Sequence, residues 1–189
     1  RVAVQGFGAV GIHSARFLAE LGAVLTAASD SQGAILNPSG LDIEALTNHK
    51  RQGAPVHTFD DGVAIERDAL VGIECDIWIP AARPDVLTAE SVSSLQAKLI
   101  LQGANIPATD AAEAWMHEQG ILNIPDFIAN AGGVICAAVE YQGGTEQQAL
   151  TAIAENIRAN TSEMLFRMAE EDLSPREAAI QLARARVEE

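Results

Sequence analysis

The sequence has few cysteines, and neither is placed for disulfide or metal chemistry. The 189 residues contain two, Cys75 in a strand-like apolar run and Cys136 in a helix-like one. Neither has another cysteine or a histidine at ligand spacing, so we expect two reduced core thiols in a cytosolic (cytoplasmic) protein. The histidines share no ligand spacing either, which argues against a metal site. They are His13, His49, His57 and His117.

Basic residues are also scarce. Twelve lysines and arginines stand against 26 aspartates and glutamates, which gives a net charge of -14. Such a chain repels a nucleic-acid backbone and an anionic membrane surface alike. We therefore expect no nucleic-acid or membrane partner. An anionic ligand must instead be held by local backbone dipoles.

Long apolar runs and a leader segment are missing as well. No stretch of eighteen or more apolar residues occurs, and no signal peptide is visible. The length suits one sizeable core with an appended helical part. The first residue is not methionine and lies inside a strand-like run. This start suggests an excised domain whose function is completed elsewhere.

A glycine-rich turn lies near the start of the sequence. The β-like run 1–5 leads into Gly6-Phe7-Gly8-Ala9-Val10-Gly11, which opens an apolar-periodic helix. Gly6 permits the tight turn, Gly8 leaves no Cβ between backbone and a pyrophosphate, and Gly11 lets the helix lie close to the strand. The free N–H groups at the positive end of the helix then face the phosphates. The turn therefore predicts a dinucleotide site.

An acidic residue follows at the spacing that such a site requires. The run 24–29 is typical of a second buried strand and ends at Asp30. An aspartate there accepts hydrogen bonds from the adenosine ribose and repels a 2′-phosphate. The alternative is an ordinary turn or cap aspartate. No lysine or arginine occurs between Asp30 and Lys50, which favours NAD over NADP.

The rest of the sequence alternates strands with helices. Strands are expected at 75–79, 98–102 and 121–124, and helices at about 42–52, 89–95 and 109–119. Residues 32–40 are rich in turn formers and predict a surface excursion, while 56–72 shows a mixed pattern. The alternation predicts an α/β fold, Rossmann-like and doubly wound, with a mostly parallel sheet and right-handed crossovers.

The character changes after Pro125. Residues 131–141 are small and apolar, 145–171 form a long amphipathic pattern, and a second helix is expected from Ser174, an N-cap, to about Val187. We therefore predict a dinucleotide-binding Rossmann domain over 1–142 and C-terminal helices over 143–189.

Small residues and amides gather at the expected carboxyl ends of the strands, where open parallel sheets bind their ligands. Asn105 and Asn130 each supply a donor and an acceptor that can fix a ribose hydroxyl or a carboxamide. Each alone is equally typical of a turn. The segments at strand ends are Gly6–Gly11, Asp30, Pro80–Ala82, Gly103–Asn105 and Asn130–Gly133.

The succession of these motifs resembles the cofactor-binding domain of the glutamate dehydrogenase family, which also holds leucine, phenylalanine and valine dehydrogenases. The resemblance covers essentially the whole chain in the right order. Its most specific part is the segment 125–134 and its least specific part is the glycine turn. The segments that carry it are Val4–Gly11, Ser29–Ser31, Cys75–Ala82, Gly103–Asn105 and Pro125–Val134.

The resemblance implies NAD(P)-dependent oxidative deamination of an L-amino acid to a 2-oxo acid and ammonia, by hydride transfer to the nicotinamide. It places the catalytic lysines and aspartate in a preceding substrate domain, so we expect no catalytic residue here. The helices from Thr145 would pack on that domain, in a homo-oligomer such as the family's hexamer. The implied cofactor residues are Gly6, Phe7, Gly8, Val10 and Gly11 for the pyrophosphate turn, Asp30 and Ser31 for the adenosine ribose, Ala81 and Ala82 for the wall, and Asn105 and Asn130 for the nicotinamide half.

The sequence departs from the family pattern in three places. Ala9 stands where many members carry asparagine, and Arg83-Pro84-Asp85 replaces the more usual Leu-Glu-Asn, which puts the contact of that asparagine in doubt. Ala137 occupies the substrate-adjacent position where glutamate-specific members commonly present a serine to the substrate side chain. This weakens the expectation of glutamate and favours a leucine, phenylalanine or valine dehydrogenase as the alternative.

Two alternatives come from other classes. A nucleotide-sensing regulatory domain, such as those attached to potassium channels, shares the glycine turn and the acid after the second strand. A degenerate fold kept for assembly would bind no nucleotide. The segment 130–133 followed by two long helices favours the enzyme, because a sensor has no evident need for it.

Overall fold

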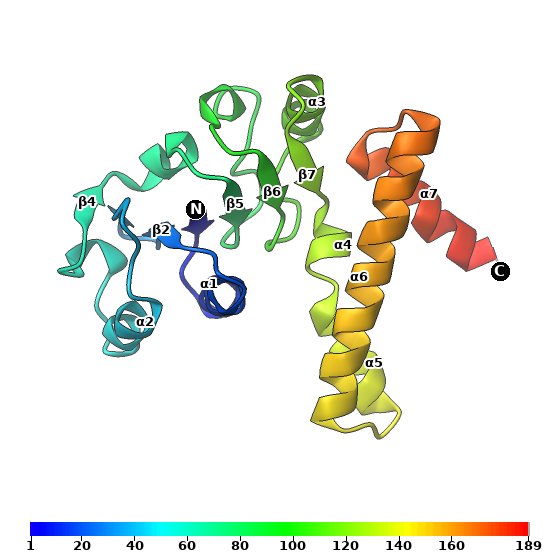
Figure 1. The fold of residues 1–189 in the computed structure, drawn as a ribbon, viewed down its shortest axis with the longest axis horizontal. Coiled ribbons are helices and arrows are strands. Elements are labelled where there is room, and N and C mark those ends of the chain that lie inside the picture. The colour runs from blue at the N-terminus through cyan, green and yellow to red at the C-terminus, as the bar shows by residue number, and fades with distance from the viewer. Residues whose placement is uncertain (189) are drawn as a thin grey trace.

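The computed structural model describes residues 1–188 and contains a seven-stranded sheet in the order β4-β3-β2-β1-β5-β6-β7 (Figure 1). The strands are β1 Val2–Gln5, β2 Leu25–Ser29, β3 Ala34–Leu36, β4 Val63–Ile65, β5 Ile77–Pro80, β6 Leu99–Leu101 and β7 Leu122–Ile124. The helices are α1 Ala9–Glu20, α2 Ile43–Arg51, α3 Asp110–Glu118, α4 Asp126–Ala129, α5 Gly132–Tyr141, α6 Glu146–Glu171 and α7 Pro175–Glu188. Short 3-10 turns lie at Val56–Thr58, Arg67–Gly72 and Val92–Ser94.

Five neighbouring strands of this sheet are parallel. β1 lies at the centre and pairs with β2 on one side and β5 on the other, and β6 and β7 continue the parallel ladder. Because parallel strands end at the same edge, the segments after β1, β2, β5, β6 and β7 meet there. The expected Rossmann-like, mostly parallel α/β fold is confirmed.

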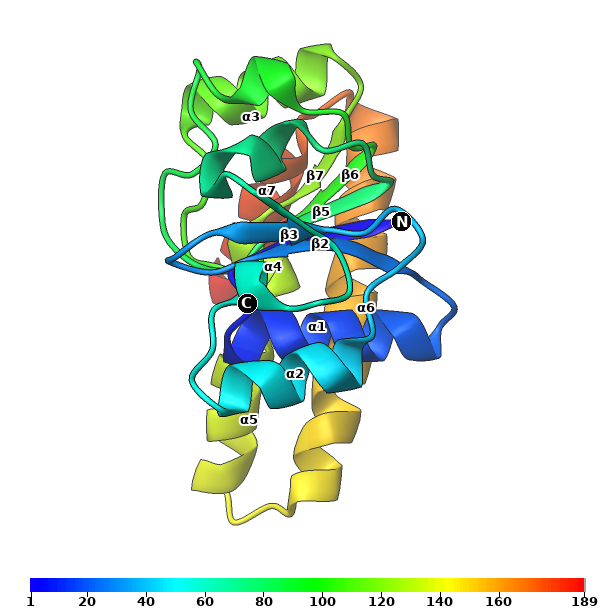
Figure 2. The same ribbon diagram turned by 90° about the vertical axis from the view of Figure 1, so that its left-hand side faces the viewer.

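Helices cover both faces of the sheet. Figure 2 shows α1 and α2 on one face and α3 on the opposite face. Along β1, Val2 and Val4 pack towards α1, whereas Ala3 packs towards Trp78 and α3, which is the alternation a strand requires. Trp78 is fully buried, and its Nε1 donates to the Leu70 carbonyl at 3.1 Å. Each face therefore buries its own apolar cluster.

The C-terminal helices cover the β7 edge of the sheet. α6 runs past α4 and α5 (Figure 1), and its Met164 is buried in a third apolar cluster with Ile124 and with Leu182 of α7. α6 begins with a reciprocal capping box between Thr145 and Gln148. The helices predicted at 109–119, 145–171 and 174–187 are confirmed to within two residues.

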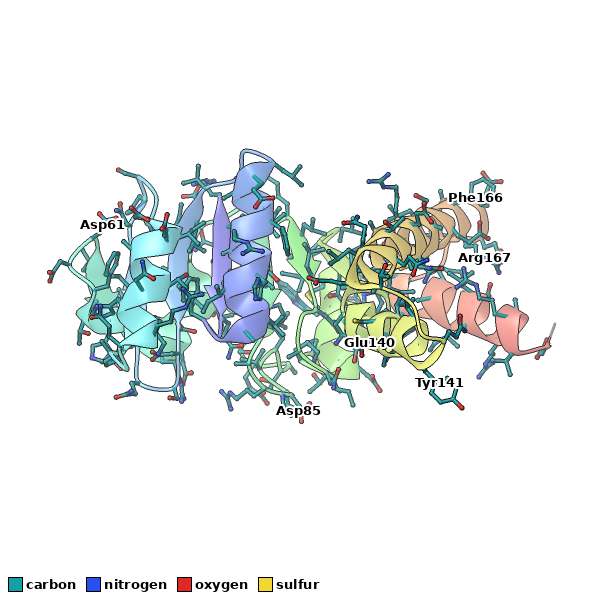
Figure 3. The ribbon with its side chains drawn as sticks, turned by 90° about the horizontal axis from the view of Figure 1, so that it is seen from below. Asp61, Asp85, Glu140, Tyr141, Phe166 and Arg167 are labelled. Carbon is teal, nitrogen blue, oxygen red and sulfur yellow. The ribbon has the colours of Figure 1, made fainter. Side chains whose placement is uncertain are left out.

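Both helices of the α5–α6 hairpin carry exposed apolar side chains. Tyr141 is 94% exposed and points away from α6, and Phe166 lies on the outer side of α6 (Figure 3). In the described chain, α5 has no buried residue at all. The prediction that Cys136 is a core thiol is therefore wrong, because its helix packs mainly against α6 and leaves it half-exposed.

The surface excursion predicted at 32–40 is also wrong. Residues Ala34–Leu36 form β3, which pairs antiparallel with β2, and Ala34 and Ile35 are fully buried. β4 extends the same antiparallel edge from within the mixed segment. Only three apolar residues lie between turn formers here, so the turn signal outweighs the strand signal in the sequence.

The helix predicted at 89–95 shrinks to the 3-10 turn Val92–Ser94. The Ser91 hydroxyl accepts from the Thr88 backbone N–H and donates to the Val86 carbonyl. Such local side-chain bonds compete with the helical pattern. Cys75, by contrast, is buried as expected, and burial raises the pKa of its thiol to about 11.

Candidate functional site

Two glycines of the turn after β1 are required by packing. Gly6 has a left-handed φ of +95°, and a Cβ there would lie 2.6 Å from the Ala82 Cβ. A Cβ on Gly11 would overlap the Gly6 carbonyl oxygen, since α1 starts directly against the turn. These two residues let the strand, turn and helix approach closely, as the motif predicts.

Gly8 is different, because beyond its two chain neighbours no atom of the described chain lies within 4 Å of the position a Cβ would take. Its backbone is extended, with φ -101° and ψ -157°, so an L-residue fits there without strain. The fold alone therefore gives no reason for glycine at this position. The open side of Gly8 is what the glycine motif predicts for a residue that a pyrophosphate approaches.

The same place is the amino end of α1. Among the described residues no side chain caps this end, and the first turn of the helix contains no acidic residue. The first N–H groups of a helix have no partner within it, and they carry partial positive charge. Within a chain of charge -14, this end of α1 is a local anion site made of backbone.

A groove extends from Val10 along the carboxyl edge of the sheet. In it, the Asn130 side-chain amide donates to the Asn105 Oδ1 at 2.9 Å, which joins the loops after β6 and β7. This bond uses one donor and one acceptor, so each amide keeps a second group for a ligand. The lining residues are Val10, Ala81, Ala82, Arg83, Pro84, Gly103, Ala104, Asn105, Ala129, Asn130, Gly132, Gly133, Val134 and Ile157.

Asp30 lies directly after β2, where the sequence predicts it, but its carboxylate is already engaged. Its Oδ2 accepts from Lys50 Nζ at 2.6 Å and from the Val56 N–H at 2.9 Å, and its Oδ1 accepts from the Gln32 N–H. Burial acts to raise the pKa of Asp30, but these hydrogen bonds together lower it below the ordinary value. The carboxylate is therefore ionised at neutral pH.

Lys50 is the functional candidate that sequence reasoning missed. It lies in the last turn of α2, and the antiparallel hairpin of β2 and β3 brings that turn back to the end of β2. The sequence separation of Asp30 and Lys50 gave no sign of contact. Recognising β3 would have been the one available signal, because it reverses the chain between them.

Three other predicted residues, Phe7, Ser31 and Ala137, have side chains that do not line the groove. The Phe7 side chain is 1% exposed, so only its backbone, whose N–H donates to the Ser29 carbonyl, lies at the turn. Ser31 lines a separate small polar hollow with Gln32 and the 3-10 turn that begins at Arg67. Ala137 is exposed on α5, one turn beyond Gly133 and Val134, and does not line the groove.

Arg83 connects the groove and the hollow. It lines the groove, and its guanidinium lies 4.0 Å from the Asp68 carboxylate at the hollow. Asp85, two residues on, has a left-handed φ of 51° and is exposed (Figure 3). The departure from the family pattern at 83–85 thus places an arginine beside the expected cofactor path.

Metal and membrane features complete the description. Residues 1–188 contain no group of three or more His, Cys, Asp or Glu side chains arranged to hold a metal ion. No helix within the same range combines the length and apolarity needed to cross a bilayer.

The fold and the strand-end groove define an α/β domain of the dinucleotide-binding class. The chain belongs to the Glutamate/Leucine/Phenylalanine/Valine dehydrogenase family, whose profile matches residues 1–189. Within that family it corresponds to the cofactor-binding domain of the glutamate dehydrogenase-like members.

Similar sequences carry glutamate dehydrogenase names. The glutamate dehydrogenase of Aeropyrum pernix is 39% identical over 196 residues, covering 98% of this chain and 47% of that protein. An NAD-specific glutamate dehydrogenase A of Halobacterium salinarum is 39% identical over 74% of this chain. An NADP-specific one of Saccharolobus shibatae is 38% identical over 75% of it, so the relatives include both cofactor types. The chain spans a third to a half of these relatives' length.

Similar solved structures show the same fold over nearly the whole chain. The hetero-hexameric glutamate dehydrogenase of Thermus thermophilus (Leu bound form) superposes with a TM-score of 0.83 at 25% identity, covering 98% of this chain and 45% of that one. The L-tryptophan dehydrogenase of Nostoc punctiforme gives 0.77 at 28% identity, covering 99% and 52%.

Proposed function

We propose that this chain binds and orients the cofactor of an amino-acid dehydrogenase that carries out NAD(P)-dependent oxidative deamination of an L-amino acid to a 2-oxo acid and ammonia. One observation carries the proposal. The open side of Gly8 lies at the uncapped amino end of α1, and the groove beginning at Val10 leads from there to the Asn105–Asn130 pair.

Each part of the site has a role in holding the cofactor. The first amides of α1 bind the pyrophosphate, Asp30 and Ser31 lie at the adenosine ribose, and Asn105 and Asn130 fix the nicotinamide half through their remaining amide groups. The wall between them is formed by Ala81 and Ala82. When bound, the nicotinamide supplies the hydride acceptor; the residues of this chain set its orientation and exclude water from one side.

The acid and base groups of the reaction are placed in a substrate domain outside these 189 residues. The length of the relatives supports this placement. The C-terminal helices from Thr145 pack against that domain, and the complete protein forms a homo-oligomer such as a hexamer. The exposed apolar residues of α5 and α6 are consistent with such packing.

Glutamate is the first candidate substrate, because the relatives are glutamate dehydrogenases. An apolar amino acid is the second candidate, and a specific observation favours it. Ala137 carries no hydroxyl for a side-chain carboxylate, at the position where glutamate-specific family members commonly present a serine. A panel of L-amino acids assayed on the complete protein decides between the two.

NAD is the proposed preferred cofactor, with NADP also accepted. The ionised Asp30 repels a 2′-phosphate, but Lys50, at 2.6 Å from it, offsets part of that charge. The preference for NAD is therefore expected to be modest.

Replacing Gly8 by alanine tests the cofactor site without disturbing the fold. The new methyl group meets open space in the protein but lies where the pyrophosphate approaches, so NADH affinity should fall at least about tenfold. Isothermal titration calorimetry with NADH and NADPH measures it, and thermal unfolding should show an unchanged Tm.

Gly72→Ala is the matched control for this substitution. A Cβ there makes ordinary contact at 3.6 Å with Ser94, away from the strand ends, so both binding and stability should stay as in the wild type. Absence of NADH and NADPH binding to the wild-type chain would remove the cofactor proposal. Unchanged NADH binding by Gly8→Ala would show that the pyrophosphate does not lie over this turn.

A further inference from the structure

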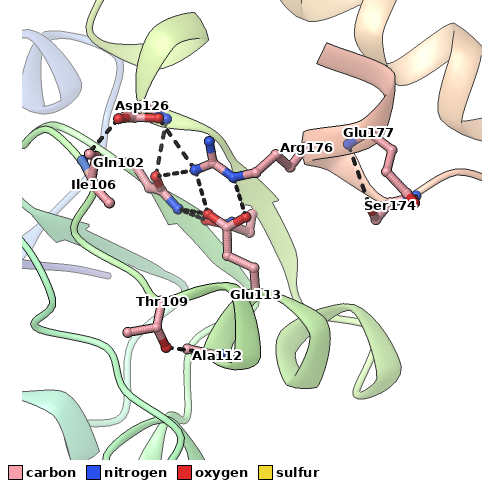
Figure 4. A network of polar contacts seen from close by, with 10 residues as sticks. Gln102, Ile106, Thr109, Ala112, Glu113, Asp126, Ser174, Arg176 and Glu177 are labelled. Atoms are coloured by element: carbon pink, nitrogen blue, oxygen red, sulfur yellow. Dashed lines mark hydrogen bonds and ion pairs between the residues drawn. The ribbon is translucent and has the colours of Figure 1, made fainter. Parts of the chain in front are cut away.

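A network of charged and polar side chains joins α7 to α3 and to the segments after β6 and β7 (Figure 4). Arg176 of α7 donates from Nε and Nη2 to the two carboxylate oxygens of Glu113 on α3, at 2.5 and 2.6 Å. The same Nη2 lies 3.3 Å from Asp126 Oδ1. Gln102, which is fully buried, donates to Glu113 and to Asn123 and accepts from the Asp126 N–H.

The position of Arg176 in its helix is unusual on electrostatic grounds. It is the second residue of α7, close to the amino end, where the helix dipole disfavours a cation. Two carboxylates with side chains only 10% and 11% exposed offset this, those of Glu113 and Asp126. Each of them in turn requires a cation, because buried carboxylates without a partner are strongly disfavoured. The main role of Arg176 is therefore to neutralise the two buried carboxylates, and it does not stabilise its own helix.

Asp126 connects this network to both asparagines of the groove. Its Oδ2 accepts from the Ile106 N–H at 2.9 Å, which holds the residue next to Asn105 in a left-handed conformation with φ 48°. Its backbone carbonyl accepts from the Asn130 N–H at 2.7 Å. One residue thus fixes the backbone on each side of the amide pair, and Arg176 fixes that residue.

We propose that Arg176 is a positioning residue for the nicotinamide half of the site, acting through Asp126 on the loops that carry Asn105 and Asn130. The inference rests on the proposed cofactor site. It goes beyond that site by assigning a role at the nicotinamide to a helix, α7, none of whose residues lines the groove. Without the arginine, Glu113 and Asp126 repel each other, and Asp126 releases the Ile106 turn.

The test compares two ligands on the Arg176→Gln variant of the chain. ADP-ribose contains the adenosine and pyrophosphate parts of the cofactor without nicotinamide, whereas NADH contains all three. We expect NADH affinity to fall roughly tenfold, the effect of one misplaced hydrogen-bonding group, and ADP-ribose affinity to stay within about twofold. Calorimetric titration measures both. An equal loss of affinity for the two ligands, or no change in either affinity, overturns the inference.

Two further variants complete the design. Arg167→Gln removes an arginine of α6 that is similarly exposed and also paired with a glutamate, Glu163, so it should affect neither ligand. If Arg176→Gln shows no cooperative unfolding, Arg176→Lys replaces it, since lysine keeps the charge but cannot pair with two carboxylates through a planar fork. Arg176→Lys should weaken the binding of NADH but not of ADP-ribose, by a smaller factor than Arg176→Gln. Equal changes in the affinity of both ligands contradict the inference. Failure of the wild type to bind either ligand refutes the cofactor site itself.

Discussion

Three glycines of one turn are glycine for different physical reasons. Gly6 and Gly11 are dictated by the close approach of β1, the turn and α1, and replacing either forces backbone to move. Gly8 is dictated by nothing in the described chain. The turn thus separates into two residues that build the fold and one residue, Gly8, whose lack of a side chain the fold does not require.

The contact between Asp30 and Lys50 sets the expected cofactor preference. Replacing Lys50 by methionine leaves an ionised carboxylate without its cation, so NADPH should bind roughly fivefold more weakly relative to NADH than in the wild type. The ratio of the two dissociation constants from calorimetry measures the effect.

Asp30→Ala is the control of opposite sign for this prediction. It removes the charge that repels a 2′-phosphate and leaves the lysine. The dissociation constant of NADPH should therefore move closer to that of NADH. The interpretation of both residues fails if the two variants shift the ratio in the same direction, or if neither shifts it.

Asp30 also shows which part of the site could be predicted from the sequence. Its place after a buried strand follows from local pattern, as does the position of Asn105 in the segment after β6. Asn130 was also expected at a strand end, but the helix α4 separates it from β7. The partner of Asp30 does not follow from local pattern, because Lys50 reaches it only through a strand of three residues set between turn formers. The same limit applies to Arg176, whose carboxylate partners come from α3 and from the start of α4.

Among the elements, α5 differs most from the rest. It is made of small and apolar residues, yet in the described chain none of them is buried, and its contacts are mainly with α6. Few buried contacts mean a low free energy of local opening. The helix is therefore expected to be the least rigid regular element beside the groove.

Hydrogen–deuterium exchange checks this expectation. Amides of α5 should exchange at least about tenfold faster than those of β1, whose four residues are all buried. α3, another short helix of the chain but with Ala112 and Met116 fully buried, is the internal control and should resemble β1 more closely. Equal protection of α5 and α3 would contradict the argument.

Long elements were predicted from the sequence more accurately than short ones. α6 was predicted to within a residue because many periodic apolar positions agree over its length. β3 and the turn at Val92–Ser94 rest on three residues each, and there a few local side-chain bonds or one antiparallel pairing decide the outcome. The antiparallel edge formed by β3 and β4 was missed for this reason.

At the scale of the whole molecule, the strand-end groove holds amides, small residues and one arginine. None of the groove's lining residues is a carboxylate, lysine or histidine, in the range that the structure describes. Proton transfer at a substrate needs a group of that kind within hydrogen-bond reach. We therefore expect this groove to orient a cofactor rather than to carry out acid–base chemistry.

The chain by itself is accordingly expected to bind NADH without deaminating any amino acid. Incubation with NAD and each of a panel of L-amino acids should give no absorbance of NADH above the background of a protein-free sample. A longer protein that contains the chain and a substrate domain is the positive control. Turnover by the chain alone would show that acid–base residues lie within it.

The length of α6 has a mechanical consequence. The helix is fixed near Met164, which is fully buried against β7 and α7, while its amino-terminal end packs mainly against α5. Between Met164 and Glu146 the helix spans about 27 Å, so a tilt of about 5° moves the free end by roughly 2 Å. A rotation small enough to leave the packing at Met164 intact is thereby amplified into an atomic displacement at α5, and with it at Gly133 and Val134 on the rim of the groove.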